Sequence, residues 1–276
     1  MGHGTGKLFR IDENGHYNFD KPNTKSQVDC EPVKSWYLPG ETYASKFGVI
    51  ASSYEECRAI SVALYLILDR RILQIFGIKD PTEQYKIIQV AWLSKIYLGL
   101  KALQMYNPTS RQWLQAHSRG CFVILNVLMR AGENFVKVTE TENGTNLLLT
   151  MDDSQIQTVG QKAMKKFLIR MQIYKSTADI EAASKMYERY SAVSNSGRFP
   201  FLKWREIVVK YKSPRIIHIQ HNTAVKDEQV DILSYEPTVE GLVKSWIDRY
   251  PNTELDDLLL DMVEENKKYF PLAFSK

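Results

Sequence analysis

The sequence has few cysteines, and it lacks long hydrophobic runs. Its 276 residues include only three cysteines, Cys30, Cys57 and Cys121, whose spacing suggests no pairing. Such an odd, sparse set argues against a disulfide framework and favours a reducing compartment. No apolar run approaches the roughly 18 residues that a membrane-spanning helix needs, and no secretory signal is visible. We therefore expect a cytoplasmic protein with no membrane partner.

The chain also lacks a strong excess of one charge. It carries 36 Lys and Arg against 32 Asp and Glu, which gives a net charge of +4 and a pI of about 8.7. This mild excess, without a dense Lys/Arg block, predicts no nucleic-acid partner. The hydrophobic fraction of 44% and charged fraction of 25% are ordinary for a globular protein. The length suffices for a sizeable core in one or two domains.

Helical periodicity dominates the first two thirds of the chain. Residues 2–50 are rich in Gly, Asn, Asp, Lys and Pro, which indicates loops and turns. Beyond them, apolar spacing and capping residues predict helices over 52–77, 81–105, 110–130, 152–174 and 179–191. Residues 134–151 change period around Asn143-Gly144, which predicts a β-hairpin.

The last third has a mixed pattern. Strands are predicted over 207–211 and 216–220, with 230–235 as their pairing partner. Helical patterns return over 238–249 and 254–269. The sequence therefore predicts a mainly α chain with a smaller mixed α/β part, and a boundary near residues 174–178.

One stretch, Ser52–Ala59, carries the candidate chemistry. Glu55 and Glu56 stand at the start of a predicted helix, and His3 lies in a Gly-rich turn near the beginning of the chain. Zinc takes neutral imidazole nitrogen and carboxylate oxygen as ligands. The same residues also suit a turn histidine and a solvated acidic helix start, where acids interact favourably with the helix dipole. The pattern alone leaves both interpretations open.

Other candidate residues have plainer interpretations beside the chemical ones. His117 on a predicted helix suits a local hydrogen bond, and His218 and His221 suit strand ends. A free amino terminus followed by His3 would also suit square-planar copper(II) or nickel(II). Cys57 is a candidate reactive thiol, but no His or Asn partner for it is evident.

Longer motifs add a family resemblance. Gly2-His3-Gly4-Thr5-Gly6-Lys7-Leu8 and Glu55-Glu56-Cys57-Arg58-Ala59 are followed by Gln115-Ala116-His117, Phe122-Val123-Ile124-Leu125 and Lys175-Ser176-Thr177. Together they resemble the dipeptidyl peptidase III zinc metallopeptidase family. That family carries His-Glu-x-x-Gly-His, then Gly-Ser/Thr-Gly-Lys-Leu, and later Glu-Glu-Cys-Arg-Ala-Glu. The resemblance covers nearly the whole chain, which looks like the C-terminal part of a family member.

This resemblance implies roles for individual residues. His3 would be the second zinc histidine and Glu56 the zinc carboxylate, with Glu55 orienting these ligands. His117 would bind the substrate or stabilise the tetrahedral intermediate across the cleft. Zinc is the implied cofactor, and the implied reaction releases dipeptides from the N-termini of short peptides. The full-length form is expected to be a monomer.

The resemblance also implies a fold. Family members have two lobes around a wide cleft: the zinc lobe is mostly helical, and the other lobe contains a β-barrel. Residues 1–173 would form the helical zinc lobe, in part, and residues 174–276 a segment of the second, β-containing lobe. The expected fold class is thus mainly α with a smaller mixed α/β part, as an incomplete two-lobed cleft fold with barrel strands in its C-terminal portion.

The sequence departs from the family pattern at several points. The first zinc histidine and the general-base glutamate of the motif are not among the 276 residues. Ile60 replaces an acid, Cys121 an arginine and Ala178 a glycine. We therefore expect a fragment, a short isoform or a truncated gene product, inactive as a peptidase by itself. The alternative is a non-catalytic peptide-binding or interaction protein derived from this family, which the loss of charge at Ile60 and Cys121 favours.

Overall fold

The computed structural model describes residues 2–132, 134–213, 218–250 and 254–266. The chain divides into two compact units, Met1–Lys212 and Ser213–Lys276. Its described part is mainly helical, with three two-stranded antiparallel sheets, as the sequence predicts. None of these small sheets closes into a barrel, so the barrel strands of the second lobe stay a prediction. Within the described residues, no helix combines the length and apolar character that crossing a bilayer requires.

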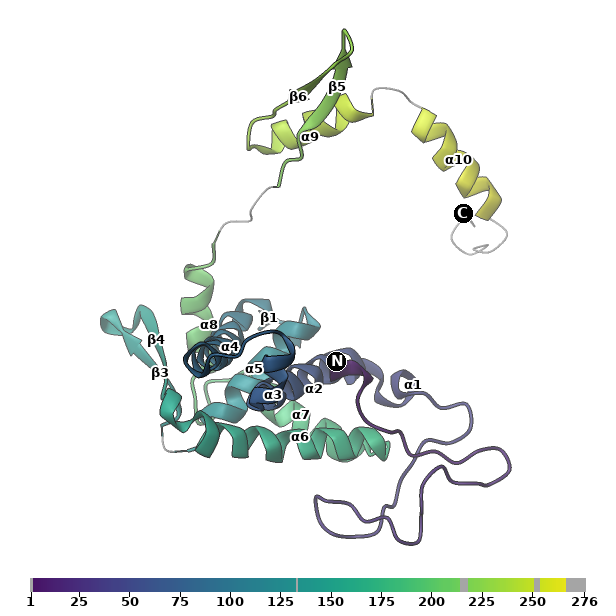
Figure 1. The fold of residues 1–276 in the computed structure, drawn as a ribbon, viewed down its shortest axis with the longest axis vertical. Helices are drawn as coiled ribbons and strands as arrows, with labels where there is room; N and C mark the ends of the chain where they lie inside the picture. The colour runs from purple at the N-terminus through teal and green to yellow at the C-terminus, as the bar shows by residue number, and fades with distance from the viewer. Residues whose placement is uncertain (1, 133, 214–217, 251–253, 267–276) are drawn as a thin grey trace. The chain divides into compact units, whose positions relative to one another are not determined.

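The first unit contains eight α-helices among its described residues (Figure 1). They are α1 Tyr43–Phe47, α2 Ala51–Leu66, α3 Arg70–Ile75, α4 Pro81–Lys101, α5 Ala116–Met129, α6 Gln161–Ser176, α7 Ile180–Ser191 and α8 Phe201–Lys210. The strands are β1 Tyr106–Asn107, β2 Gln112–Trp113, β3 Val136–Thr141 and β4 Asn146–Met151. Short 3-10 turns are η1 Gly2–Gly4, η2 Gly48–Ile50, η3 Ala102–Met105, η4 Glu142–Gly144 and η5 Asp153–Gln155, and a π-helical turn, η6 Ile156–Gly160, precedes α6.

Helix α5 is the centre of the first unit. Every residue from Gly120 to Met129 is buried, as expected for a helix that is apolar on all sides. Helices α2 and α4 both pack against α5. The contacts are close because two glycines lie in them: a Cβ on Gly99 of α4 would meet Cys121 O at 2.6 Å, and a Cβ on Gly120 would meet the Cys57 backbone at 3.0 Å.

The helix starts predicted at residues 81 and 179 follow capping chemistry. Asp80 accepts a hydrogen bond from Glu83 N in front of Pro81, and Asp179 accepts one from Ala182 N. The prediction of one helix over 52–77 is wrong in its length, since the helix ends at Leu66 and a separate short helix follows. The side chain of Asp69 caps that second helix, through Arg71 N.

Two other predictions are corrected by the structure. The helix predicted over 110–130 begins only at Ala116, because Gln112–Trp113 pairs with Tyr106–Asn107 as a small hairpin. The strand predicted over 207–211 lies instead largely within α8, where Phe201, Trp204 and Ile207 are buried at helical spacing. Tertiary burial of this apolar face outweighs the β-branched run that favours a strand.

The predicted hairpin around Asn143-Gly144 is confirmed. Val136–Thr141 pairs antiparallel with Asn146–Met151. Asn143 and Gly144 both have positive φ, 55° and 83°, the conformation for which this pair of residues is favoured. The compact first unit continues through α8, so the assignment of separate lobes at residue 173 stays a prediction.

The second unit contains a hairpin and two helices among its described residues. The elements are β5 Asn222–Lys226, β6 Gln229–Leu233, α9 Val239–Arg249 and α10 Glu254–Asn266. Asn222 ties the hairpin to α9, because its Nδ2 donates to Ser245 O at 2.8 Å and its Oδ1 accepts from Arg249 Nε at 2.8 Å. Both helices agree with prediction within the described range. The strand predicted over 216–220 is wrong in its described part, because residues 218–220 form no strand and β6 pairs instead with Asn222–Lys226. The rest of that prediction and the end of the predicted helix 254–269 lie outside the described range.

Residues 5–42 form a long loop that is fastened to the end of α6. The Tyr37 ring is fully buried, and its hydroxyl donates to Lys175 O at 2.8 Å. Phe9 N donates to Ser176 O, also at 2.8 Å. These bonds bring the loop that begins at the candidate site back to the helix that carries Lys175.

Ala178 closes the turn after α6 in an unusual conformation. Its φ is +56°, and a left-handed backbone costs a residue with a Cβ about 1–2 kcal/mol. The methyl group is nevertheless buried, with 3% exposure. The backbone therefore favours glycine at this position, whereas the packing uses the methyl.

The contact between α4 and α5 predicts a cost for any side chain at residue 99. We expect Gly99→Ala to lower the free energy of unfolding by about 1–2 kcal/mol, because overpacking against the Cys121 carbonyl outweighs the gain in helix propensity. Urea unfolding followed by circular dichroism measures this. Gly197→Ala is the control, since its Cβ would meet nothing closer than 3.6 Å. An equal effect of both substitutions would contradict the expectation.

Candidate metal centre

Adjacent acids on α2 face different surroundings. Successive helical residues point about 100° apart, so Glu55 and Glu56 face largely different groups and share only His3. Glu55 contacts Arg58 and Lys175, whereas Glu56 contacts the imidazole rings of His3 and His117. One carboxylate is thus tied into a salt-bridge network, and the other lies between two histidines.

The Glu55 carboxylate is shared by two buried cations. Arg58 Nη2 donates to Oε1 at 2.5 Å and Nε to Oε2 at 3.0 Å. Lys175 Nζ donates to Oε2 at 2.7 Å. The Arg58 side chain is fully buried, and the side chains of Lys175 and Glu55 are 10% and 16% exposed. Such charges are tolerated in the interior only when paired and hydrogen-bonded.

The charge state of this network follows from its contacts. Burial acts to raise the pKa of Glu55, but the hydrogen bonds and charges of Arg58 and Lys175 outweigh it and hold that pKa below its ordinary value. Burial lowers the pKa of Lys175, with the hydrogen bond to Glu55 opposing the shift. Glu55 is therefore the anion that both cations require.

Arg58 also holds the turn that carries His3. Its Nη2 donates to Gly2 O at 2.7 Å, and its Nη1 donates to Thr5 Oγ1 at 2.7 Å. Gly2 lies directly on α2, because a Cβ there would meet Ala59 Cα at 2.6 Å. The guanidinium therefore fixes η1 against the helix, and with it the position of the His3 ring.

His3 faces both carboxylates. Its Nδ1 lies 3.4 Å from Glu55 Oε1, and its Nε2 lies 3.6 Å from Glu56 Oε2. A carboxylate on one ring nitrogen commonly orients a histidine whose other nitrogen binds a metal. Glu55 occupies that orienting position at Nδ1. The other ring nitrogen, Nε2, faces Glu56.

His117 contacts Glu56 from the start of α5. Its Nε2 lies 2.9 Å from Glu56 Oε2, and its Nδ1 lies 3.1 Å from Gln115 Nε2. Gln115 Oε1 accepts from Ser118 N, so the Gln115 amide turns its NH₂ group toward the ring. Nδ1 is therefore the acceptor, and Nε2 carries the proton that it donates to Glu56.

The donors present fit part of a zinc site. Two ligands at 2.0–2.2 Å in tetrahedral geometry lie about 3.4 Å apart, close to the 3.6 Å between His3 Nε2 and Glu56 Oε2. Catalytic zinc sites use three protein ligands. Among the described residues, no group of three His, Cys, Asp or Glu side chains converges as a metal site. These residues thus supply two matched donors.

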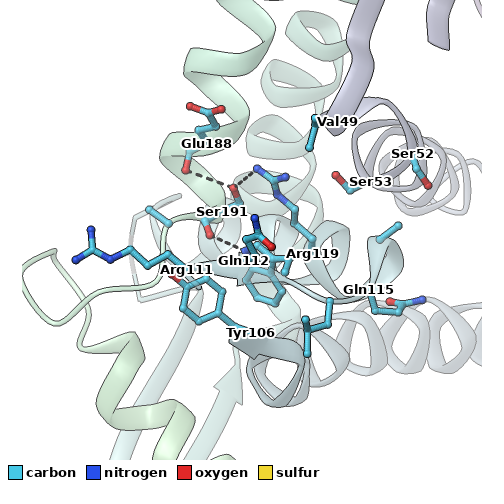
Figure 2. A pocket seen from close by; sticks show the side chains of 14 residues that line it. Val49, Ser52, Ser53, Tyr106, Arg111, Gln112, Gln115, Arg119, Glu188 and Ser191 are labelled. Carbon is cyan, nitrogen blue, oxygen red and sulfur yellow. Dashed lines mark hydrogen bonds between the residues drawn. The ribbon is translucent and has the colours of Figure 1, made fainter. Parts of the chain in front are cut away.

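A cavity of about 500 Å³ adjoins this centre. Ser52 and Ser53 of α2 line it, as does Gln115, which caps the start of α5 and contacts His117. Figure 2 shows Arg119 against Ser191, whose Oγ accepts from Nη2 at 3.0 Å. Arg119 Nε is buried and has no hydrogen-bond partner within the described residues. The cavity therefore offers hydroxyl, amide and guanidinium groups to a polar ligand.

The other candidate residues lie apart from this centre. Cys57 is fully buried, and burial raises the pKa of its thiol well above the ordinary value, so it is no reactive thiolate. All three cysteines are free, as the sequence predicts. Cys121 is also buried, and Ile60 packs against the core. His218 and His221 precede β5 in the second unit. The copper or nickel hypothesis depends on Met1, outside the described residues.

Sequence reasoning missed three supporting residues. The motifs include Arg58, Lys175 and Gln115, but their pattern indicates no role for them at the centre. The spacing of Glu55 and Arg58, three residues apart on a helix, was a usable signal for their pairing. No local pattern indicates Lys175, because it approaches Glu55 from 120 residues away.

Comparisons with known proteins give consistent matches. Residues 1–250 match the sequence profile described as peptidase family M49. Dipeptidyl peptidase 3 of Rattus norvegicus is 41% identical to this chain over 275 residues. Dipeptidyl peptidase 3 of Mus musculus is 40% identical to it over 275 residues. Each alignment covers 98% of this chain and 37% of the relative, so the chain spans 37% of the length of these curated relatives. A solved structure, described as DPP III from Caldithrix abyssi, aligns with a TM-score of 0.44 at 19% identity, over 75% of this chain and 30% of that chain.

The buried network predicts that Arg58 contributes more to the free energy of unfolding than an exposed arginine does. We expect Arg58→Met to lower the free energy of unfolding by about 3 kcal/mol, because buried ion pairs are costly to break. The control is Arg71→Met, which removes the exposed pair with Asp69 and should cost no more than about 1 kcal/mol. Chemical denaturation measures both. Similar losses in the two variants would show that the network around Glu55 is not a stabilising centre.

Proposed function

This chain belongs to peptidase family M49, a family of metallopeptidases, and from that premise we propose that its residues form part of the active site of a zinc-dependent dipeptidyl peptidase. Such an enzyme releases dipeptides from the N-termini of short peptides. The observation that carries the proposal is the Glu56 carboxylate, with imidazole nitrogens of His3 and His117 at 3.6 and 2.9 Å. Because the chain spans 37% of its relatives' length, the activity is proposed for a protein of which this chain is a part.

We assign the zinc ion to His3 and Glu56. A bound zinc ion supplies Lewis-acid polarisation of the scissile carbonyl and a more acidic water. The spacing of His3 Nε2 and Glu56 Oε2 supports this assignment, and the contact of Glu55 with His3 Nδ1 supports an orienting role for Glu55. Arg58 supports the site indirectly, because it binds the Gly2 carbonyl of the turn that carries His3.

His117 is proposed as the residue that contacts the substrate. With Nδ1 accepting from Gln115, its Nε2–H can donate a hydrogen bond. A donor aimed at the oxygen that gains charge in the tetrahedral intermediate lowers the barrier. In the absence of peptide the same proton is donated to Glu56. The polar cavity beside Gln115 and Ser52 is a suitable place for part of the bound peptide.

The remaining family features are proposals of the same kind. Residues 1–173 are proposed as the helical zinc lobe and residues 174–276 as a segment of the β-containing lobe. A cytoplasmic location, a monomeric full-length form and the absence of a nucleic-acid partner are proposed with them. The three free cysteines and the mild net charge of +4 support a reducing compartment and no polyanionic nucleic-acid partner.

A second candidate function is non-catalytic peptide binding or another interaction role. The observation that favours it is the lack of a third converging metal ligand among the described residues. Cys121 and Ile60 agree with it, since neither brings a charge toward the centre: Cys121 is buried and Ile60 packs against the core. Zinc content separates the two candidates. About one zinc per chain after dialysis supports the enzymatic one, and a zinc-free chain that still binds peptides supports the second.

Zinc affinity should depend on the two assigned ligands. We expect His3→Ala and Glu56→Gln each to weaken zinc binding by about tenfold or more, since even groups that only support a ligand are worth 10–100-fold. Competition with a chromophoric chelator measures the affinity. His16→Ala is the matched control, because His16 is an exposed histidine paired with Asp12, and it should change affinity by no more than about twofold. Equal zinc affinities in all three variants would contradict the assignment of His3 and Glu56 as zinc ligands.

The 276-residue polypeptide by itself should not hydrolyse peptides. Its described residues supply two zinc donors, and the general base of the family motif is not among the 276 residues. Arylamine release from a dipeptidyl-arylamide, with zinc added, is the measurement. Release by the wild-type chain that disappears in Glu56→Gln would overturn this expectation.

A further inference from the structure

Helix α6 carries an unbalanced positive charge. Its sixteen residues include five Lys or Arg and no Asp or Glu. Lys162, Lys166 and Arg170 recur every fourth residue, so they lie along one face over about 12 Å of helix. Like charges at this spacing repel one another and destabilise a helix. The three cations on this face therefore lower the stability of α6.

These three cations line a cavity of about 390 Å³. Arg130, at the end of α5, lines the same cavity, and α5, α6 and α7 pack together in the first unit (Figure 1). None of the lining residues is acidic. Within the described part of the chain, none of the four cations has a carboxylate within ion-pair distance.

Arg130 is the most constrained of the four. Its Nε donates to Asn126 Oδ1 at 2.7 Å, and its guanidinium lies over the Phe199 ring at 5.5 Å. Burial lowers the pKa of Arg130, and the nearby charges of Arg189 and Arg198 lower it further. Arg130 thus has a neutral hydrogen-bond acceptor and an aromatic face, but no carboxylate to balance its charge within the described residues.

The cavity also has an apolar wall. Val127 and Phe167 are buried core residues, and Val159 and Tyr190 are partly buried beside them. A concave site of a few hundred Å³, with an apolar wall and a few convergent polar groups, is the usual form of a small-molecule site. A solvated basic surface would account for the exposed lysines Lys162 and Lys166, but not for the half-buried guanidinium of Arg130.

We propose that this cavity binds a small organic polyphosphate, with its phosphates on Lys162, Lys166, Arg170 and Arg130 and its organic part against Val127 and Phe167. Four cations without a counter-charge match a ligand of several negative charges better than a monophosphate. The concave shape favours a small molecule over a nucleic acid or a membrane surface. This site is separate from Glu56 and does not depend on zinc.

The test uses ATP as the probe, with AMP, adenosine and inorganic tripolyphosphate as comparisons. Isothermal titration of the metal-free 276-residue chain, without divalent cations, should give ATP an affinity about tenfold or more above that of AMP, because each added phosphate contact is charge-assisted. Tripolyphosphate should bind more weakly than ATP, since it lacks the organic part. Adenosine should not bind measurably. Added salt should weaken ATP binding, because exposed cations are screened.

Matched double variants locate the site. Lys166→Gln with Arg170→Gln should weaken ATP binding about tenfold or more. The control, Lys137→Gln with Lys185→Gln, removes two exposed charges outside the cavity and should change affinity by no more than about twofold. Glutamine is a good helix former, and circular dichroism verifies folding of both.

Several outcomes would overturn the proposal. ATP binding no tighter than adenosine binding, no ATP binding at millimolar concentration, or equal losses in the two double variants would each do so. Single-stranded RNA or anionic phospholipid vesicles that bind more tightly than ATP, and lose binding in the Lys166/Arg170 variant, would assign the surface to a macromolecule instead. Because zinc is absent throughout, failure here leaves the proposed peptidase site unaffected.

Discussion

The Glu55 carboxylate is the interaction on which the candidate centre depends. It lies between Arg58 and Lys175, two cations that could not remain buried without it. Through Arg58 it fixes the first turn of the described chain, and through Lys175 it reaches the end of α6, where Tyr37 fastens the long loop. A single charge thus joins three segments that are distant in the sequence.

This arrangement explains why two consecutive acids are needed. The helix turns Glu55 inward and Glu56 toward the histidines, so the first stabilises the fold while the second remains available as a ligand. His3 touches both carboxylates. The contact with Glu55 and the contact with Glu56 therefore fix the position of the His3 ring together.

The sequence predicted what local chemistry determines. Asn143-Gly144 marks its hairpin, and Asp179 marks the start of its helix. The β-branched run predicts a strand over 207–211, whereas these residues lie largely in α8, because only tertiary contacts reveal which face of that helix is buried. The family resemblance indicates His3, Glu55, Glu56 and His117 as site residues, where their local pattern leaves plainer interpretations open, and the structure brings the four together. The contact of Lys175 with Glu55 and the tautomer of His117 could not be predicted from sequence, because both depend on partners that the fold brings close.

Ala178 is subject to two opposing structural preferences. The backbone at φ +56° prefers glycine, and the buried methyl prefers alanine. A glycine at residue 178 would relieve the backbone but leave a small void in the turn after α6. The turn that follows α6 is therefore a compromise between backbone strain and side-chain packing, and neither glycine nor alanine satisfies both.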